Sequence, residues 1–127
     1  MNDRKPRVLV ADDSATVRFA LFALLNARYD VYLAPDGETA IEIAGDIMPH
    51  AILLDVMMPG MDGFETCRRL RADANTVMTP IIMVTSQAEE WDVEAGYASG
   101  CTDYVMKPVD RAELMTKLDS WLGAVAA

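Results

Sequence analysis

The chain has 127 residues, of which 52% are hydrophobic and 24% charged, and its formal net charge is −9. This size and composition are typical of one globular domain and exclude a disordered or fibrous protein. The acidic balance argues against a nucleic-acid partner, and no apolar run approaches the ~20 residues of a membrane span. The two cysteines are too few for a disulfide framework. We therefore expect a cytoplasmic protein with free thiols that contacts neither nucleic acid nor membrane.

Short apolar runs, typical of buried parallel strands, alternate with helical patterns along the chain. The expected strands are Arg7–Ala11, Val31–Ala34, Ala51–Leu54, Pro80–Val84 and Asp103–Met106. The expected helices are about Ser14–Ala27, Gly37–Asp46, Phe64–Ala72, Glu90–Ser99 and Arg111–Leu122. This alternation predicts an α/β fold, a doubly wound parallel sheet with helices on both faces.

Acidic residues stand where three of these helices begin. Asp36 precedes the second helix as a simple N-cap. Asp62 with Glu65, and Asp110 with Glu113, have the spacing of a capping box, in which the glutamate reaches back to the cap residue. These signals favour the expected helix starts.

The first helix carries two apolar stripes at helical spacing. The stripe that we expect to face the sheet consists of Val17, Leu21 and Leu24. The second stripe consists of Ala15, Phe19 and Phe22. A helix packed on a sheet needs one apolar face, so the second stripe is either open to a partner or covered by a neighbouring segment. Both interpretations stay open from the sequence.

Four of the apolar runs end on residues that can bind a metal or a phosphoryl group. Asp12 and Asp13 follow the first run, and Asp55 follows the third. Thr85 and Lys107 follow the fourth and fifth. Because ligands of open α/β sheets bind at the carboxyl ends of the strands, we expect these side chains to meet there.

The acidic residues point to a hard cation. Asp12 and Asp13 repel each other unless they share a cation, and Mg²⁺ prefers carboxylates with phosphate oxygens. The alternative is that this pair caps the first helix. Asp55 follows three aliphatic residues, where an ionised carboxylate needs a cation or strong donors. Its alternative role is to cap the following turn.

Each of the remaining candidates also has an ordinary structural alternative. Lys107 suits a phosphate or a carboxylate, and a cis bond to Pro108 would aim it over the sheet edge, but most lysines lie on the surface. Thr85 can donate to a phosphoryl oxygen or simply end a strand. Tyr104 is either a core aromatic or a side chain that responds to the site.

Together these residues describe a nucleophilic carboxylate, acids for Mg²⁺ and donors for a phosphoryl group. No Gly-rich nucleotide loop is present in the sequence, so we expect a phosphoryl donor other than ATP.

From about Arg7 to Leu122 the chain is similar to the receiver domains of two-component response regulators, in particular to single-domain chemotaxis receivers. The stretches that carry the resemblance are Val10–Ser14, Leu53–Gly63, Val84–Ser86 and Gly100–Pro108. The resemblance implies a (βα)₅ fold with sheet order 2-1-3-4-5, the order given for a chemotaxis receiver as a known example. It also implies a single receiver domain over residues 1–127, with its core at about 7–122.

The resemblance further implies that Asp55 accepts a phosphoryl group from a histidine kinase or a histidine phosphotransfer protein. It assigns Mg²⁺ to Asp12, Asp13, Asp55 and the backbone carbonyl of Met57. It assigns phosphoryl contacts to Thr85 and Lys107, and a change of rotamer on activation to Tyr104. We expect the chain to catalyse its own phosphorylation and dephosphorylation at most.

Two surfaces follow from the same resemblance. The first helix would dock the kinase through Ala15, Phe19 and Phe22. The last strand and its flanking helices would form an output face for a downstream target or output domain, with residues Trp91, Val93, Tyr97 and Tyr104. The resemblance also allows a homodimer that forms on phosphorylation. The residues do not specify the cognate kinase, the target or the phosphoryl lifetime.

Two other functions are compatible with some of the same residues. A Mg²⁺-dependent phosphatase of the haloacid-dehalogenase type needs a second aspartate two residues after the nucleophile, where this chain has Met57, and it needs a longer chain to cover its substrate. A pseudo-receiver, which only binds partners, would be expected to lack an acid, the threonine or the lysine, and none is missing here.

Overall fold

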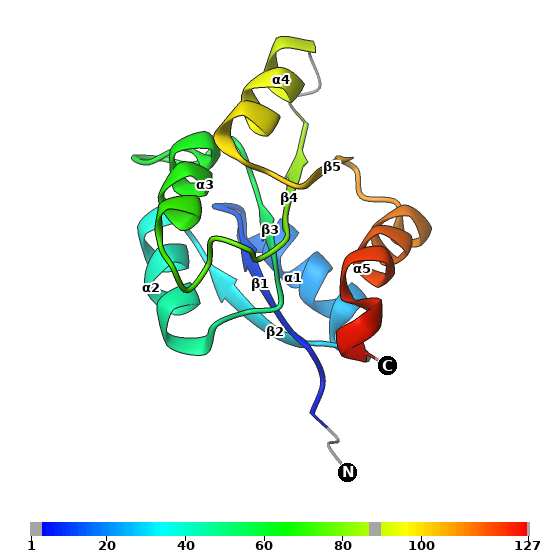
Figure 1. The fold of residues 1–127 in the computed structure, drawn as a ribbon. Coiled ribbons are helices and arrows are strands. Elements are labelled where there is room, and N and C mark those ends of the chain that lie inside the picture. The colour runs from blue at the N-terminus through cyan, green and yellow to red at the C-terminus, as the bar shows by residue number, and fades with distance from the viewer. Residues whose placement is uncertain (1–3, 87–89, 127) are drawn as a thin grey trace.

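The computed structural model describes residues 4–86 and 90–126, in which five strands alternate with five helices (Figure 1). The strands are β1 (Arg7–Ala11), β2 (Asp30–Ala34), β3 (Ala51–Leu54), β4 (Ile81–Thr85) and β5 (Asp103–Met106). The helices are α1 (Ala15–Leu25), α2 (Gly37–Ile47), α3 (Gly63–Ala72), α4 (Glu90–Ser99) and α5 (Arg111–Ala126).

The strands form one parallel sheet in the order β2-β1-β3-β4-β5, which confirms the predicted fold. Helices α1 and α5 lie on one side of the sheet and α2 and α3 on the other, with α4 next to α3 (Figure 1). Among the described helices, none combines the length and apolar character that a membrane span requires.

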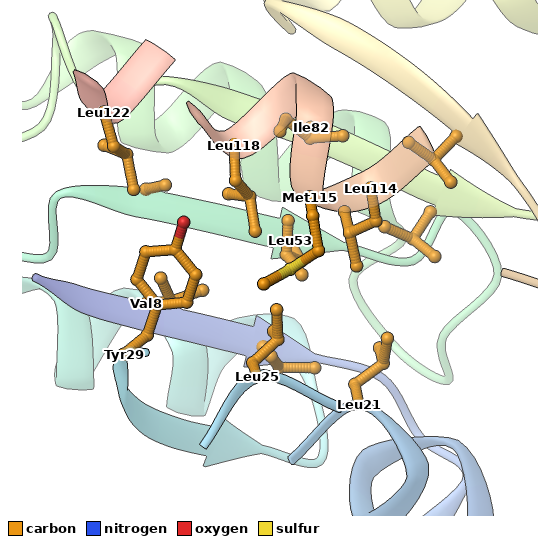
Figure 2. Packing of buried hydrophobic residues seen from close by; sticks show 14 residues of the cluster. Val8, Leu21, Leu25, Tyr29, Leu53, Ile82, Leu114, Met115, Leu118 and Leu122 are labelled. Carbon is orange, nitrogen blue, oxygen red and sulfur yellow. The ribbon is translucent and has the colours of Figure 1, made fainter. Parts of the chain in front are cut away.

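Each face of the sheet has its own apolar core. On the side of α1 and α5, leucines from both helices meet the sheet and the buried ring of Tyr29 (Figure 2). The second core lies under α2 and α3 and includes both cysteines, Cys67 and Cys101, which are free thiols. Strands β1, β3 and β4 are buried on both faces, and this is why their sequences are continuous apolar runs.

Several element boundaries differ from the sequence prediction, most of them by one or two residues. Strand β4 begins one residue later because Pro80 has no N–H; its carbonyl accepts from the Ile52 N–H at 2.9 Å. Helix α1 ends two residues earlier, where the N–H groups of Arg28 and Tyr29 both donate to the Leu25 carbonyl in a turn. Helix α5 continues past the expected end at residue 122 to residue 126.

The predicted helix starts at Asp36 and Asp62 are confirmed, with one correction. Each carboxylate accepts the N–H three residues later, at 2.7 and 2.9 Å. Glu65, however, does not complete a capping box, because its carboxylate binds Arg68 at 2.8 Å and Arg69 at 3.0 Å. These helical ion pairs are exposed and contribute little to stability.

The two apolar stripes of α1 lie on different sides of the helix, as their spacing predicts. Leu21 is buried, and Val17 and Leu24 pack against the core on the sheet side. The side chain of Phe19 is 69% exposed and that of Phe22 is 37% exposed, and Ala15 is exposed as well. The second stripe is therefore exposed over most of Phe19 and over part of Phe22.

Candidate functional site

Three carboxylates converge at the carboxyl edge of the sheet. Asp12 and Asp13 follow β1, and Asp55 follows the neighbouring strand β3, where its N–H donates to the Ala11 carbonyl at 2.9 Å. One carboxylate oxygen from each aspartate lies within 4.8 Å of the others. Asp12 is 2% exposed and Asp55 is 5% exposed, whereas Asp13 faces solvent. The juxtaposition predicted from the strand ends is therefore present.

The backbone and side chain of Asp12 both make hydrogen bonds. Its N–H donates to the Ala34 carbonyl at 3.1 Å, and its Oδ1 accepts from the Ser14 N–H at 2.9 Å. The Arg18 guanidinium donates to its backbone carbonyl at 2.7 Å. Ser14 is the N-cap of α1, accepting from the Val17 N–H at 3.3 Å, so the alternative that the aspartate pair caps this helix is wrong. Sequence reasoning did not find Arg18, because nothing in its local pattern shows that it reaches back to β1.

Lys107, which follows the edge strand β5, reaches the carboxylates from further along the same sheet. Its Nζ lies 2.7 Å from Asp12 Oδ2 and 3.5 Å from Asp55 Oδ1, and its side chain is 21% exposed. Its N–H donates to the Thr85 carbonyl at 3.0 Å, and the Lys107–Pro108 peptide bond is cis. The alternative of an ordinary surface lysine is therefore wrong.

The remaining predicted residues lie around this cluster. Thr85 is fully buried as the last residue of β4, between the strands that carry Asp55 and Lys107. Met57 lies two residues after Asp55, and its side chain is exposed. Tyr104 lies on β5, partly buried against the core under α2 and α3.

The family model for the response regulator receiver domain matches residues 8–119. The chain belongs to the response regulator receiver domain family. The predicted family is confirmed.

Curated relatives of this receiver domain are response regulators. It is 42% identical over 115 residues to the response regulator PleD of Caulobacter vibrioides, covering 90% of this chain and 25% of PleD. It is 37% identical over 119 residues to the DNA-binding response regulator MtrA of Mycobacterium tuberculosis, covering 93% of this chain and 51% of MtrA. The chain thus spans a quarter to a half of these relatives.

Solved structures of similar domains share the fold along nearly the whole length. The chemotaxis protein CheY4 of Vibrio cholerae superposes with a TM-score of 0.88 at 33% identity, covering 93% of this chain and 99% of CheY4. The receiver domain of the sensor histidine kinase PA1611 from Pseudomonas aeruginosa also has a TM-score of 0.88, at 34% identity, covering 94% and 98% of the two chains. That structure has a magnesium ion coordinated in its active-site cleft.

Burial and the neighbouring charges shift the pKa values of Asp55 and Lys107. Burial, and next the charge of Asp12, raise the pKa of Asp55 to about 6 overall, against the opposing effects of Lys107 and the Met57 N–H. Burial disfavours the Lys107 ammonium, but its bond to Asp12 and the charge of Asp55 raise the pKa of Lys107 overall. One lysine is therefore shared by two buried carboxylates, and it does not fully offset the burial of Asp55.

This donor set fits Mg²⁺. The three aspartates supply hard oxygen ligands from two neighbouring strands, and the exposure of Asp13 leaves a side of the site open to water and phosphate oxygens. A divalent cation would also relieve the repulsion that raises the pKa of Asp55.

The raised pKa of Asp55 predicts a specific dependence of stability on pH in metal-free buffer. Between pH 4 and 6 the carboxyl binds a proton in the folded protein but not in the unfolded chain, so stability falls as pH rises through this window. A shift from 3.8 to about 6 corresponds to roughly 3 kcal/mol at most. Asp55→Asn has no such carboxyl, so the free energy of unfolding of the variant should increase relative to that of the wild type from pH 4 to 6.

Urea unfolding of both proteins with a chelator present measures this difference. Comparing the variant with the wild type cancels the titration of groups that the two share. A difference that stays constant from pH 4 to 6 would contradict the raised pKa of Asp55.

Proposed function

We propose that this receiver domain is a phosphoryl-accepting switch of a two-component system, with Asp55 as acceptor and a histidine kinase or histidine phosphotransfer protein as donor. The observation that carries the proposal is the geometry at one sheet edge. A buried carboxylate, Asp55, lies beside two further acids and within 3.5 Å of the Lys107 ammonium. Each group has a task in phosphoryl transfer, which depends on positioning and charge neutralisation.

In this proposal Mg²⁺ is held by Asp12, Asp13, Asp55 and the backbone carbonyl of Met57. Bound there, the ion would neutralise charge on the phosphoryl oxygens. The Thr85 hydroxyl and the Lys107 ammonium would then contact the phosphoryl group. Lys107 already lies against both buried acids, so it needs to move only within the site to reach an oxygen on Asp55.

The transfer balances without any further reactant. A carboxylate oxygen of Asp55 forms a bond to phosphorus, and the bond from phosphorus to the donor's imidazole nitrogen breaks. The other ring nitrogen of the donor's phosphohistidine carries a proton, so the imidazole leaves with the electron pair of the broken bond as a neutral group. Burial of Asp55 keeps water from the acyl phosphate, except on the open side near Asp13.

The output face in this proposal consists of β5 with α4 and α5. Tyr97 is 49% exposed there, and Tyr104 and Val93 are partly buried. The side chain of Trp91, also predicted for this face, lies outside the residues whose side chains are described. Rearrangement of Tyr104 would change the surface offered to a downstream target, an output domain or a second copy.

The kinase-docking surface in this proposal is the second stripe of α1. Besides exposed Phe19 and Phe22, an apolar groove of about 260 Å³ separates α1 from the loop at Pro108 and Val109. Lys107 is one of the residues that line this groove, and it also contacts Asp12 and Asp55, so a helix seated on α1 would bring its phosphohistidine near the acidic site. This surface suits a partner helix that presents an apolar face to α1.

We expect Phe19→Glu to slow phosphoryl transfer from the cognate kinase by about tenfold, because a charge in an apolar contact is costly to desolvate. Transfer from acetyl phosphate should be unchanged, since Phe19 lies outside the acidic cluster. Phosphotransfer profiling against the host's kinases first identifies the donor, and Phe19→Leu serves as the apolar control. An equal loss with both donors would show damaged packing instead of lost docking.

The proposed function is tested by mass spectrometry of the intact protein after incubation with acetyl phosphate. With Mg²⁺ we expect the mass of one phosphoryl group to be added, and with a chelator none. Uptake that is independent of Mg²⁺ would contradict the metal site. No uptake, together with no effect of Mg²⁺ on tryptophan fluorescence or amide resonances, would favour a pseudo-receiver, and turnover of a phosphate monoester would favour a phosphatase.

A further inference from the structure

The ring of Tyr104 occupies space that a glycine on α4 leaves open. A Cβ atom added at Gly96 would lie 2.6 Å from Cε2 of that ring and 3.3 Å from its hydroxyl oxygen. Real Cβ atoms do not come that close to a heavy atom, so a side chain at position 96 and the ring in this place exclude each other. The ring of Tyr97 lies next to it, with 6.2 Å between ring centroids.

The end of α4 that carries Gly96 is held by hydrogen bonds. The Gly96 carbonyl accepts from the Ser99 hydroxyl at 2.6 Å and from the Cys101 N–H at 3.1 Å. One turn further, the Arg71 guanidinium of α3 donates to the Gly100 carbonyl at 2.7 Å. The first two bonds close the end of the helix, and the Arg71 bond joins that end to α3.

The backbone of β5 is fixed as well. Tyr104 pairs with Met83 of β4, and its carbonyl accepts from Lys117 Nζ of α5 at 2.6 Å. The same ammonium binds Asp103 at 2.9 Å. With both backbones held, the Tyr104 side chain is the part that must move when position 96 gains a methyl group.

We propose that Gly96 is a positioning residue of the switch: it forms the seat of the Tyr104 ring and so sets how that ring responds to the phosphoryl site. Tyr104 and Lys107 lie on one short stretch of chain, and Lys107 contacts Asp12 and Asp55 directly. The coupling to the phosphoryl site rests on the proposed function, whereas the seat itself does not.

The seat is tested by Gly96→Ala with Gly45→Ala as the matched control. Gly45 is also a helical glycine, on α2, and a Cβ there meets nothing within 4 Å. In protein with ¹³C-labelled tyrosine rings we expect the Tyr104 resonance to shift in Gly96→Ala and not in Gly45→Ala. Tyr104→Phe assigns that resonance among the four tyrosines. An unshifted Tyr104 resonance in Gly96→Ala would overturn the seat.

The coupling is tested by titrating the same variants with beryllium fluoride, a phosphoryl mimic, in the presence of Mg²⁺. We expect the apparent affinity of Gly96→Ala to differ from that of Gly45→Ala by about fivefold or more. The difference should disappear when both substitutions are made in a Tyr104→Ala background, as a double-mutant cycle requires.

Two outcomes separate the inference from the function on which it rests. If the wild type binds beryllium fluoride and Gly96→Ala binds it as Gly45→Ala does, the positioning role is overturned and the proposed function stands. If the wild type neither binds the mimic nor takes up phosphoryl groups, the proposed function fails and the coupling fails with it, while the ring resonances still decide the seat.

Discussion

An Asp55→Asn variant is expected to accept no phosphoryl group from acetyl phosphate in the presence of Mg²⁺. The amide lacks the charged oxygen that attacks phosphorus, so we expect uptake to fall about 100-fold or more, below detection by intact-protein mass spectrometry. The variant should fold, because an uncharged group of the same shape removes the desolvation that raises the pKa of Asp55.

Asp46→Asn is the matched control for this loss. Asp46 is an exposed carboxylate on α2, outside the cluster at the sheet edge. The control should accept as much phosphoryl group as the wild type. Undiminished uptake in Asp55→Asn would mean that another residue is the acceptor.

Gly63→Ala is expected to destabilise the protein by about 3 kcal/mol, through a clash with backbone instead of a flexible side chain. A Cβ at Gly63 would overlap the carbonyl oxygen of Asp55 and lie 2.8 Å from Val56 Cα. Gly63 also donates its N–H to the Val56 carbonyl at 2.8 Å, which holds the start of α3 against the loop after β3. Relief of the clash must therefore move the start of α3 or the loop that carries Asp55.

Gly45→Ala is the same chemical change, but we expect it to raise the free energy of unfolding. A methyl group there meets no neighbour, so the better helix propensity of alanine should stabilise α2 by up to about 1 kcal/mol. Urea unfolding in metal-free buffer measures both variants. A Gly63→Ala protein as stable as Gly45→Ala would show that the start of α3 can move away from Asp55 at little cost.

The gathering of Asp12, Asp55 and Lys107 could be predicted from sequence for a simple physical reason. Apolar runs separated by helices predict parallel strands, and parallel strands bring the residues that follow them to one edge. The predicted sheet order came from the family resemblance, because the crossover rules alone leave several orders open. Assignment of a role to each of these residues remains a proposal.

The features that the sequence did not reveal depend on contacts between distant segments. Arg18 and Gly96 look unremarkable in their helices, and only the fold brings them to Asp12 and Tyr104. Glu65 had the spacing of a capping box, yet two arginines on the next turn compete for its carboxylate. Helix α5 continues beyond the expected end at Leu122, because the glycine at residue 123 is compatible with helix.

The most direct test of the phosphoryl-accepting switch is identification of the residue that carries the phosphoryl group. The wild-type protein is incubated with Mg²⁺ and acetyl phosphate, then treated with borohydride, which reduces an aspartyl phosphate to homoserine. Peptide mass spectrometry then locates the reduced residue. We predict reduction at Asp55 alone and only when Mg²⁺ was present. Reduction at Asp12 or Asp13, or a phosphoryl group on His50, would contradict the assignment.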